Sequence, residues 1–188
     1  KKLLWSTHEA GKLTVVPHER LVPLEVSKPL RGDHRQLRAG DCVVAFSRKQ
    51  IFKLSETIRR KNPDASVNVV YGGLPYDVRE RETREFNDGV VAGKFHILVT
   101  TDAIAYGLNM NIRRIVFSTM RKFDGRSMVS LSKTTCLQVA GRAGRFGMKF
   151  ADRGYATTLH DNDHAHLTQA FEGKLPDITR CGLFPTAD

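Results

Sequence analysis

The segment Gln138–Arg145 groups the side chains in this sequence that are best suited to binding phosphates. Arg142 and Arg145 stand three residues apart, separated by small residues, and Gln138 precedes them. If the segment is helical, the three side chains fall at positions i, i+4 and i+7 and project from one face. The glycines and alanines between them have small side chains that project little from the helix surface. A large anion such as a polyphosphate could therefore lie close against it.

Composition favours a polyanionic partner for one globular domain. The chain has 188 residues, of which 40% are hydrophobic, and its formal net charge is +10. An excess of positive charge suits nucleic acid or an anionic membrane. Because we find no uncharged apolar run of membrane-spanning length, nucleic acid is the better expectation. The three cysteines are widely spaced, which indicates neither a disulfide framework nor a zinc site.

Strand-length apolar runs alternate with helical patterns along the chain. Residues 42–46 form a continuous apolar run, which is typical of a strand covered on both faces. Residues 48–61 have helical spacing, with Ser47 as the expected N-cap and Asn62-Pro63 as the stop. The further expected elements are strands at 67–71, 95–99, 112–117 and 155–159, helices at 75–87 and 163–172, and a hairpin turn at Asp124-Gly125.

This alternation predicts an α/β fold, a doubly wound and mostly parallel sheet with helices on both faces. The first forty residues, which include 13–16 and 21–26, are expected to form short edge strands or an extended connector. The chain begins at Lys1 without a methionine or a signal sequence, so we expect a fragment or a processed product.

Polar residues follow three of the predicted strands. Ser47 and Arg48 follow the first, Tyr71 and Gly72 end the second and begin its turn, and Thr101 follows the third. Because the carboxyl ends of parallel strands meet at one edge, we expect these groups to lie near one another. Hydroxyls, cations and backbone N–H groups suit a sugar-phosphate backbone.

Plainer interpretations exist for each of these residues. Ser47 is expected to cap a helix whatever else it binds, and Arg48 could be an ordinary surface residue. Tyr71 could pack at the rim of the core. Asp102 could cap a helical turn. The histidines of segment 160–166 could suggest a metal, but their spacing favours helix capping by neighbouring Asp and Asn side chains, so we expect no metal site.

Four segments together resemble the motifs of a known family. In order and spacing they are similar to motifs four, four-a, five and six of superfamily-two helicases, in the second of their two RecA-like domains. The segments are 43–47, 71–74, 101–109 and 138–145. A narrower resemblance is to the mitochondrial degradosome RNA helicase family, of the DExH type. It is carried by 38–47, 101–104, 108–109 with 112–115, and 180–187.

This resemblance implies that ATP is the cofactor. Arg142 and Arg145 would face the ATP phosphates, and Arg145 would act as the arginine finger. Gln138 would touch the nucleotide or the motor motifs, and Asp102 and Gly107 would lie near the ribose or the arginines. The sequence has no Gly-x-x-x-x-Gly-Lys-Ser/Thr loop and no Asp-Glu box. The Mg²⁺ ligands would therefore lie on the first RecA-like domain, and this chain alone is expected not to hydrolyse ATP.

The resemblance also implies that RNA is the substrate, with a mitochondrial matrix location and an exoribonuclease as a partner. Ser47, Arg48, Tyr71, Gly72 and Thr101 would bind the RNA backbone, with little sequence preference and a steep dependence on salt. Residues 1–40 would be a connector with edge strands, 41–173 the RecA-like domain, and 174–188 the start of a C-terminal extension. Two other functions stay open: a non-catalytic RNA-binding scaffold and a DNA translocase.

Overall fold

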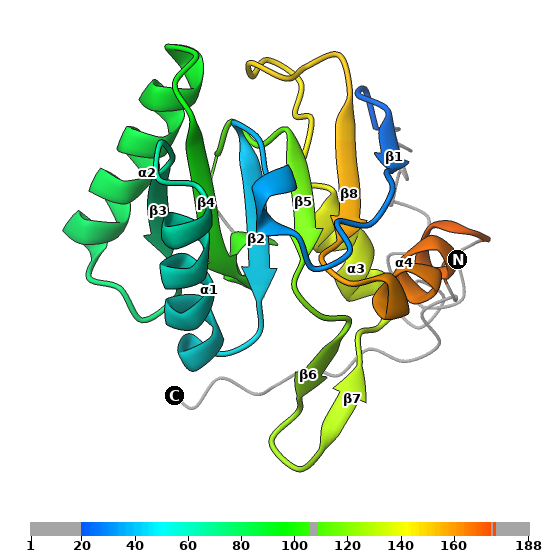
Figure 1. The fold of residues 1–188 in the computed structure, drawn as a ribbon. Coiled ribbons are helices and arrows are strands. Elements are labelled where there is room, and N and C mark those ends of the chain that lie inside the picture. The colour runs from blue at the N-terminus through cyan, green and yellow to red at the C-terminus, as the bar shows by residue number, and fades with distance from the viewer. Residues whose placement is uncertain (1–19, 106–108, 174, 176–188) are drawn as a thin grey trace, which may run out of the picture. The chain divides into compact units, whose positions relative to one another are not determined.

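A six-stranded parallel sheet in the order β1-β8-β5-β2-β4-β3 organises the fold (Figure 1). The computed structural model describes residues 20–105, 109–173 and 175, and the sheet lies in the compact unit Leu21–Gly173. The strands are β1 (Leu24–Val26), β2 (Asp41–Ala45), β3 (Ser66–Val70), β4 (His96–Thr101), β5 (Arg114–Phe117) and β8 (Gly154–Thr158). Every neighbouring pair runs parallel.

Helices cover both faces of the sheet, so the expected doubly wound α/β architecture is confirmed. Helix α1 (Arg48–Lys61) buries Ile51 and Ile58 on one face. The other face is covered by three helices, which are α2 (Tyr76–Val91), α3 (Lys133–Ala140) and α4 (His164–Phe171).

Strand β2 shows why its sequence is apolar at every position from 42 to 45. Cys42 and Val44 pack into the core on the side of α2, α3 and α4, whereas Val43 and Ala45 pack on the side of α1. Successive side chains of a strand point to opposite faces, so a strand covered on both sides needs apolar residues throughout. All four residues are buried, as the sequence predicts.

The predicted elements are present with small shifts at their ends. Helix α1 begins after Ser47, whose hydroxyl accepts a hydrogen bond from the backbone N–H of Gln50 at 3.2 Å. Helix α2 extends beyond the predicted end at residue 87 and stops before Gly93, where φ is +75°. The helix ends there because glycine adopts this left-handed backbone conformation without steric cost.

The predicted hairpin is also present. Strands β6 (Arg121–Phe123) and β7 (Met128–Ser130) pair antiparallel and extend away from the carboxyl ends of the large sheet (Figure 1). The carboxylate of Asp124 accepts hydrogen bonds from the N–H groups of Arg126 and Ser127, at 2.8 and 2.9 Å. Asp124 therefore closes the turn.

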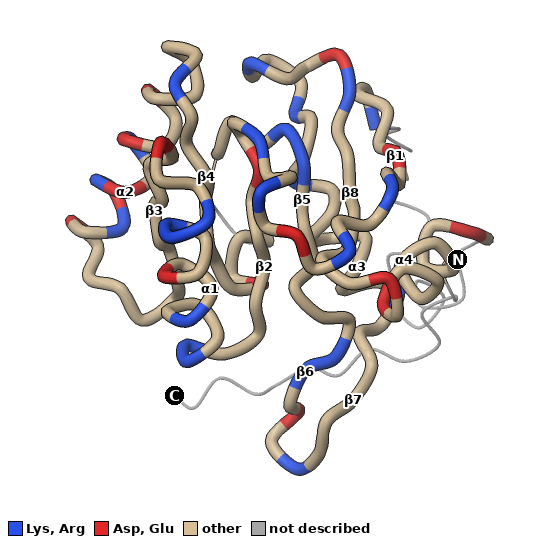
Figure 2. The backbone as a smooth tube through the Cα atoms, in the orientation of Figure 1, with Lys and Arg blue, Asp and Glu red and all other residues tan. Residues whose placement is uncertain are grey.

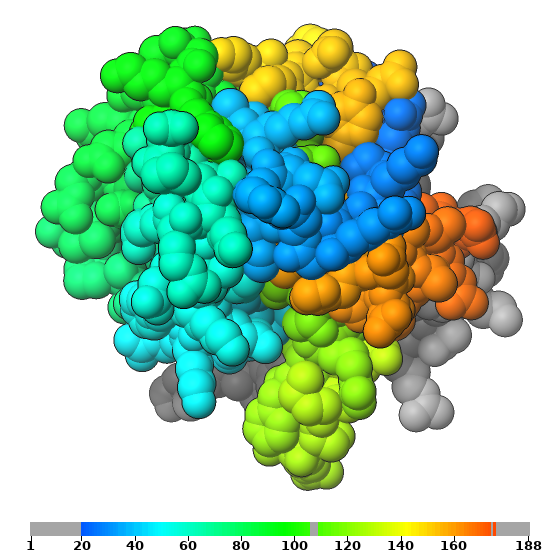
Figure 3. Space-filling model, viewed as in Figure 1, coloured from blue at the N-terminus to red at the C-terminus, as the bar shows by residue number. Residues whose placement is uncertain are grey.

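Residues 21–40 of the N-terminal segment belong to the same compact unit as the central strands. β1 is an edge strand paired with β8, and Leu30 and Leu37 are buried in the core on the α1 side. In Figure 3 the blue surface of this segment lies over the middle of that face. The segments 13–16 and 180–187 lie outside the described residues, and the proposed division into three parts stays a prediction.

Side chains hydrogen-bond to the backbone of the other edge strand, β3, on the side away from β4. The Arg59 guanidinium donates to the carbonyl oxygen of Val67 at 3.0 Å. The carboxylate of Glu82 accepts from the N–H of Val69 at 3.1 Å. Two backbone groups that face away from the sheet thus have partners from α1 and α2.

Candidate functional site

The carboxyl edge of the sheet brings together the three loops that the sequence singles out. β4 lies between β2 and β3, and the register places Ala45 opposite Thr101 and Val70 opposite Thr100. The loops that follow these residues are consequently neighbours. In an open α/β sheet this is the edge at which ligands bind.

The start of α1 presents positive charge at this edge. Ser47 is exposed as the N-cap, and Arg48 and Lys49 follow it in a first turn without an acidic residue. Cations at a helix N-terminus are unfavourable for the helix, because the unpaired N–H groups already carry partial positive charge. The same arrangement is favourable for a bound anion.

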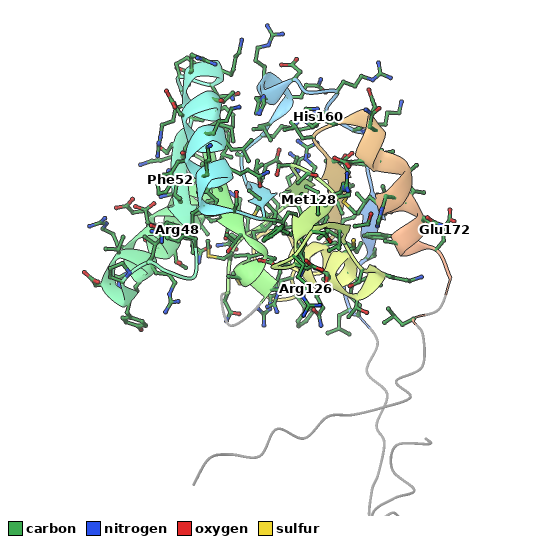
Figure 4. The ribbon with its side chains drawn as sticks, turned by 90° about the horizontal axis from the view of Figure 1, so that it is seen from below. Arg48, Phe52, Arg126, Met128, His160 and Glu172 are labelled. Carbon is green, nitrogen blue, oxygen red and sulfur yellow. The ribbon has the colours of Figure 1, made fainter. Side chains whose placement is uncertain are left out.

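Arg48, at the start of α1, and Tyr71, after β3, meet in the structure. The Arg48 guanidinium lies 5.2 Å from the centre of the Tyr71 ring, within the range of a cation–π interaction. Phe52 packs edge-on against the same ring, with 6.0 Å between ring centres. Arg48 and Phe52 both project from α1 (Figure 4). Phe52 was not singled out from the sequence, although its i, i+4 spacing from Arg48 is a usable signal.

A pocket of about 350 Å³ lies beside Tyr71 and Gly72. It is bounded by the ends of β3 and β4 and by the first turns of α2, where the Arg79 guanidinium lies 5.9 Å from the centre of the Tyr76 ring. Tyr76 is 72% exposed. This second pair of a cation and an aromatic ring was missed by the sequence analysis, because neither residue falls in a recognised motif.

Thr101 and Asp102 form the third loop. The Thr101 hydroxyl accepts a hydrogen bond from the N–H of Ala103 at 3.3 Å, at the start of a short 3₁₀ helix, Asp102–Ala105. The Asp102 carboxylate lies 3.9 Å from the ammonium group of Lys122 in β6. Gly107 lies outside the described residues. The expected position of Asp102 and Gly107 near a ribose stays a prediction.

The helical arrangement considered for Gln138, Arg142 and Arg145 is wrong. Helix α3 ends at Ala140, so Gln138 is on the helix and both arginines are in the turn after it. Gly144 adopts φ +60°, and a Cβ added there would overlap the backbone nitrogen of Gly154. The helix ends here because the backbone at Gly144 packs directly against the backbone at the start of β8.

Both arginines nevertheless form hydrogen bonds with residues that lie between β4 and β5 in the sequence. The Arg142 guanidinium donates to the carbonyl oxygen of Ala105, and the Arg145 guanidinium donates to the side-chain oxygen of Asn109. Arg142 is half-buried, and its pKa is lowered by burial and, to a smaller extent, by the positive charge of Arg145. Arg145 is exposed, as is Gln138 on α3. The turn therefore carries two neighbouring guanidinium groups.

The described residues contain no group of three or more His, Cys, Asp or Glu side chains placed to hold a metal ion. His166 contacts the carbonyl oxygen of Leu131 at 2.9 Å, and His164 lies 3.5 Å from the Thr158 hydroxyl. In the same part of the chain, no helix is long and apolar enough to cross a membrane.

Comparison with protein families agrees with this geometry. The family described as "Helicase conserved C-terminal domain" matches residues 27–147, which include all three loops and both arginines. The chain belongs to this family. The expectation of a second RecA-like helicase domain is thereby confirmed.

Related proteins indicate the type of helicase that this chain resembles. The chain is 43% identical over 176 residues to the mitochondrial ATP-dependent RNA helicase SUV3 of Oryza sativa subsp. japonica, covering 94% of this chain and 30% of that protein. It is 36% identical over 180 residues to SUV3 of Saccharomyces cerevisiae, covering 93% of this chain and 24% of that protein. The predicted similarity to mitochondrial DExH RNA helicases is confirmed, and the chain spans less than a third of these relatives.

Solved structures confirm the fold. The DExH-box NTPase HrpB of E. coli superposes with a TM-score of 0.56 at 21% identity, over 75% of this chain and 20% of that one. The C-terminal domain of the DEAD-box protein Dbp5 gives a TM-score of 0.53 at 18% identity, over 80% and 82% of the two chains.

Proposed function

We propose that this chain is the second motor domain of an ATP-dependent RNA helicase that acts in mitochondrial RNA unwinding and turnover. ATP with Mg²⁺ would bind between this domain and a first RecA-like domain, which would supply the Mg²⁺ ligands. The proposal is supported by the family, by the names of the relatives, and above all by the turn that carries Arg142 and Arg145.

The two arginines differ in a way that suggests separate roles. Arg142 is half-buried and bonded to a backbone carbonyl, so it is suited to a fixed contact with a phosphate. Arg145 is exposed and bonded to the side chain of exposed Asn109, which can release it. Arg145 is therefore the better arginine finger, which would stabilise charge on the γ-phosphate in the transition state.

RNA would bind along the loops at Ser47, Tyr71 and Thr101. The cation at Arg48 and the N–H groups of the first turn of α1 suit backbone phosphates, and the Tyr71 ring offers a stacking surface for a base. These contacts do not read base edges. Binding should therefore depend little on sequence and steeply on salt.

The segment after β4 would couple the two sites. It follows Thr101, the last residue of β4 and a proposed RNA contact. Ala105 in this segment accepts the Arg142 hydrogen bond, and Asn109 accepts that of Arg145. A movement of the arginines toward ATP would thus pull on the chain next to the RNA contact. Cleft closure on ATP and release after hydrolysis would alternately tighten and loosen the grip on RNA.

The test is the RNA-stimulated ATPase of the full-length protein with Arg145→Ala. We expect the rate to fall by about a thousandfold or more, as for loss of an arginine finger, with RNA affinity within about twofold of wild type. Arg60→Ala, which removes an exposed arginine at the end of α1, is the matched control and should keep full activity.

Each other outcome has a definite meaning. A fully active Arg145→Ala protein would refute the finger assignment. A wild-type protein that binds RNA but never hydrolyses ATP would instead be a scaffold. Equal stimulation by RNA and by DNA of the same sequence would favour a DNA translocase. The exoribonuclease partner rests on the family resemblance, and co-purification of a 3′-end-trimming activity with the full-length protein would test it.

A further inference from the structure

A second pocket lies on the α1 face, toward the amino ends of the strands. Its volume is about 540 Å³, within the range of ligand sites. It is enclosed by the segment between β1 and β2, by the start of β5 and by the start of β8. Its lining includes five cationic side chains, which are Lys28, Arg35, Arg38, Arg113 and Arg114, and no acidic one.

The charge of this pocket is only partly neutralised by its surroundings. Arg114 is bonded to the buried carboxylate of Asp41 at 2.5 Å, and Arg35 is bonded to Asp33 at 3.0 Å. The remaining cations are Lys28, Arg38 and Arg113. In the part of the chain that the structure describes, none of these three has a carboxylate within salt-bridge distance.

Nearby acidic groups do not change this balance. Glu25, opposite Tyr155 in the β1–β8 register, is bonded to Arg153 at 2.5 Å. The buried hydroxyl of Ser27, another lining residue, has no hydrogen-bond partner among the described residues. A ligand here would therefore meet the Tyr155 ring and three cations that have no salt-bridge partner among the described residues. Of the three, Arg113 also interacts at longer range with the buried carboxylate of Asp41.

The cations meet here because three distant segments converge. Lys28 precedes Arg38 by ten residues and Arg113 by eighty-five. The Lys and Arg positions of these segments lie side by side between β2 and β8 in Figure 2. In Figure 3, the green surface at the start of β5 is visible at the bottom of a gap between the blue N-terminal segment and the yellow loop before β8.

We propose that this pocket binds a compact run of phosphate groups, at a site separate from the carboxyl-edge site. β2 alone places about 16 Å between the two edges, at about 3.3 Å per residue over five residues. Three cations around one small cavity match a ligand that concentrates several negative charges in a short length. Phosphates do so, and arginine binds them through paired N–H donors. A free polyphosphate and an RNA backbone share this chemistry.

The site does not depend on the motor function proposed above. The variant that tests it is Arg38→Gln/Arg113→Gln in the full-length protein, since both side chains are at least partly exposed and neither lies at the carboxyl edge. The matched control is Arg60→Gln/Lys61→Gln, which removes two exposed charges at the end of α1. Thermal unfolding verifies that all three proteins are folded.

The first probe is inorganic tripolyphosphate, whose binding is measured by calorimetry while saturating ADP fills the nucleotide site. The second is a fluorescent oligouridylate, whose binding is measured by anisotropy. We expect the pocket variant to weaken at least one of them by about tenfold or more, and the control to stay within about twofold. If RNA is the occupant, the slope of log affinity against log salt should fall by roughly 0.7 for each phosphate that the variant no longer binds.

Which probe responds identifies the source of the phosphates. An effect on tripolyphosphate alone indicates a soluble polyphosphate, and an effect on both indicates that the RNA backbone can also enter. The proposal is overturned if neither probe distinguishes the pocket variant from the control. It is also overturned if polyglutamate binds the wild-type pocket as tightly as tripolyphosphate, because the site would then be one for carboxylates of a protein partner.

Discussion

The guanidinium group of Arg48 lies 5.2 Å from the centre of the Tyr71 ring, so residues that follow two different strands form one surface. Arg48 belongs to the first turn of α1, and Tyr71 follows β3. The strand between them, β4, contributes Thr101 to the same edge. Cation and ring are thus held side by side, as the proposed contact with an RNA phosphate and a base requires.

Replacing Tyr71 tests whether this ring binds RNA. Tyr71→Ala should weaken binding of a labelled oligouridylate by about fivefold or more, because stacking of one base on an aromatic ring contributes about 1–3 kcal/mol. Tyr71→Phe keeps the ring and should bind within about twofold of wild type. Fluorescence anisotropy on the full-length protein measures both. Unchanged binding by the alanine variant would leave Tyr71 with only a packing role against Phe52 and Arg48.

Gly144, in the arginine turn, should be more sensitive to substitution than Gly147. At Gly144→Ala, the left-handed backbone and the overlap with the Gly154 backbone together should cost about 2–5 kcal/mol. Gly147 also has positive φ, +77°, but a Cβ there would have no atom within 4 Å, so Gly147→Ala should cost only about 1–2 kcal/mol. Urea denaturation compares the two. Equal losses of stability would show that the close approach to Gly154 contributes nothing.

His96 should make stability depend on pH. Its Nδ1 lies 2.9 Å from the side-chain oxygen of Asn68, whose amide nitrogen faces Glu82 at 3.2 Å, so Nδ1 is the donor. Nε2 packs against Gly89. Burial lowers the pKa of His96, as does the charge of Lys94 to a smaller extent.

The sign of this effect follows from proton binding. Below the pKa of an unfolded histidine, about 6.5, the unfolded chain binds a proton that the folded chain resists. The free energy of unfolding should therefore fall as pH drops through and below that value. Burial also lowers the pKa of His34, so His96→Asn should remove only part of the dependence. Urea denaturation between about pH 5 and 8 measures it, and an identical pH profile in the variant would contradict the assignment.

A double-mutant cycle at Gly89 checks the same contact. Gly89→Ala alone should destabilise the protein by about 1–3 kcal/mol, because the new methyl group would meet the His96 ring. In a His96→Ala background the ring is absent, and the same change should be neutral or stabilising by up to about 1 kcal/mol through helix propensity. Additive effects would mean that the ring moves aside freely.

Arg114 and Asp41 form a buried pair whose loss should be costly. Asp41 is 0% exposed and Arg114 8%, and the guanidinium is bonded to both carboxylate oxygens, at 2.5 and 3.1 Å. Arg114→Met would leave the carboxylate buried without its partner, at a cost of about 3–5 kcal/mol. Asp41→Leu/Arg114→Met should be less destabilised than the single variant. Thermal unfolding compares the stability of the two variants. A double variant less stable than Arg114→Met would show that the pair is not coupled.

Sequence alone predicted those features that depend on local signals. The run at 42–46, the Ser47 cap and the Asp124-Gly125 turn each depend on residues within a few positions of one another, and all three are present. The parallel sheet followed from the alternation of such elements. The strand-end loops then became neighbours because strand order brings β2, β4 and β3 together.

Features that depend on distant residues were not predictable in this way. The pattern of Gln138, Arg142 and Arg145 is compatible with a helix, but α3 stops because the turn packs against Gly154 in a later strand. The partners of the two arginines, Ala105 and Asn109, lie more than thirty residues earlier in the chain. The contact between Arg48 and Tyr71 likewise exists only after the sheet forms.

The hydrogen bonds from Arg59 and Glu82 to β3 affect how copies of this protein behave when crowded. The side of β3 that faces away from β4 would otherwise be a template on which a strand from another molecule could grow. An incoming strand would first have to displace both side chains from Val67 and Val69. Copies of this protein can therefore come close together without joining edge to edge through β3.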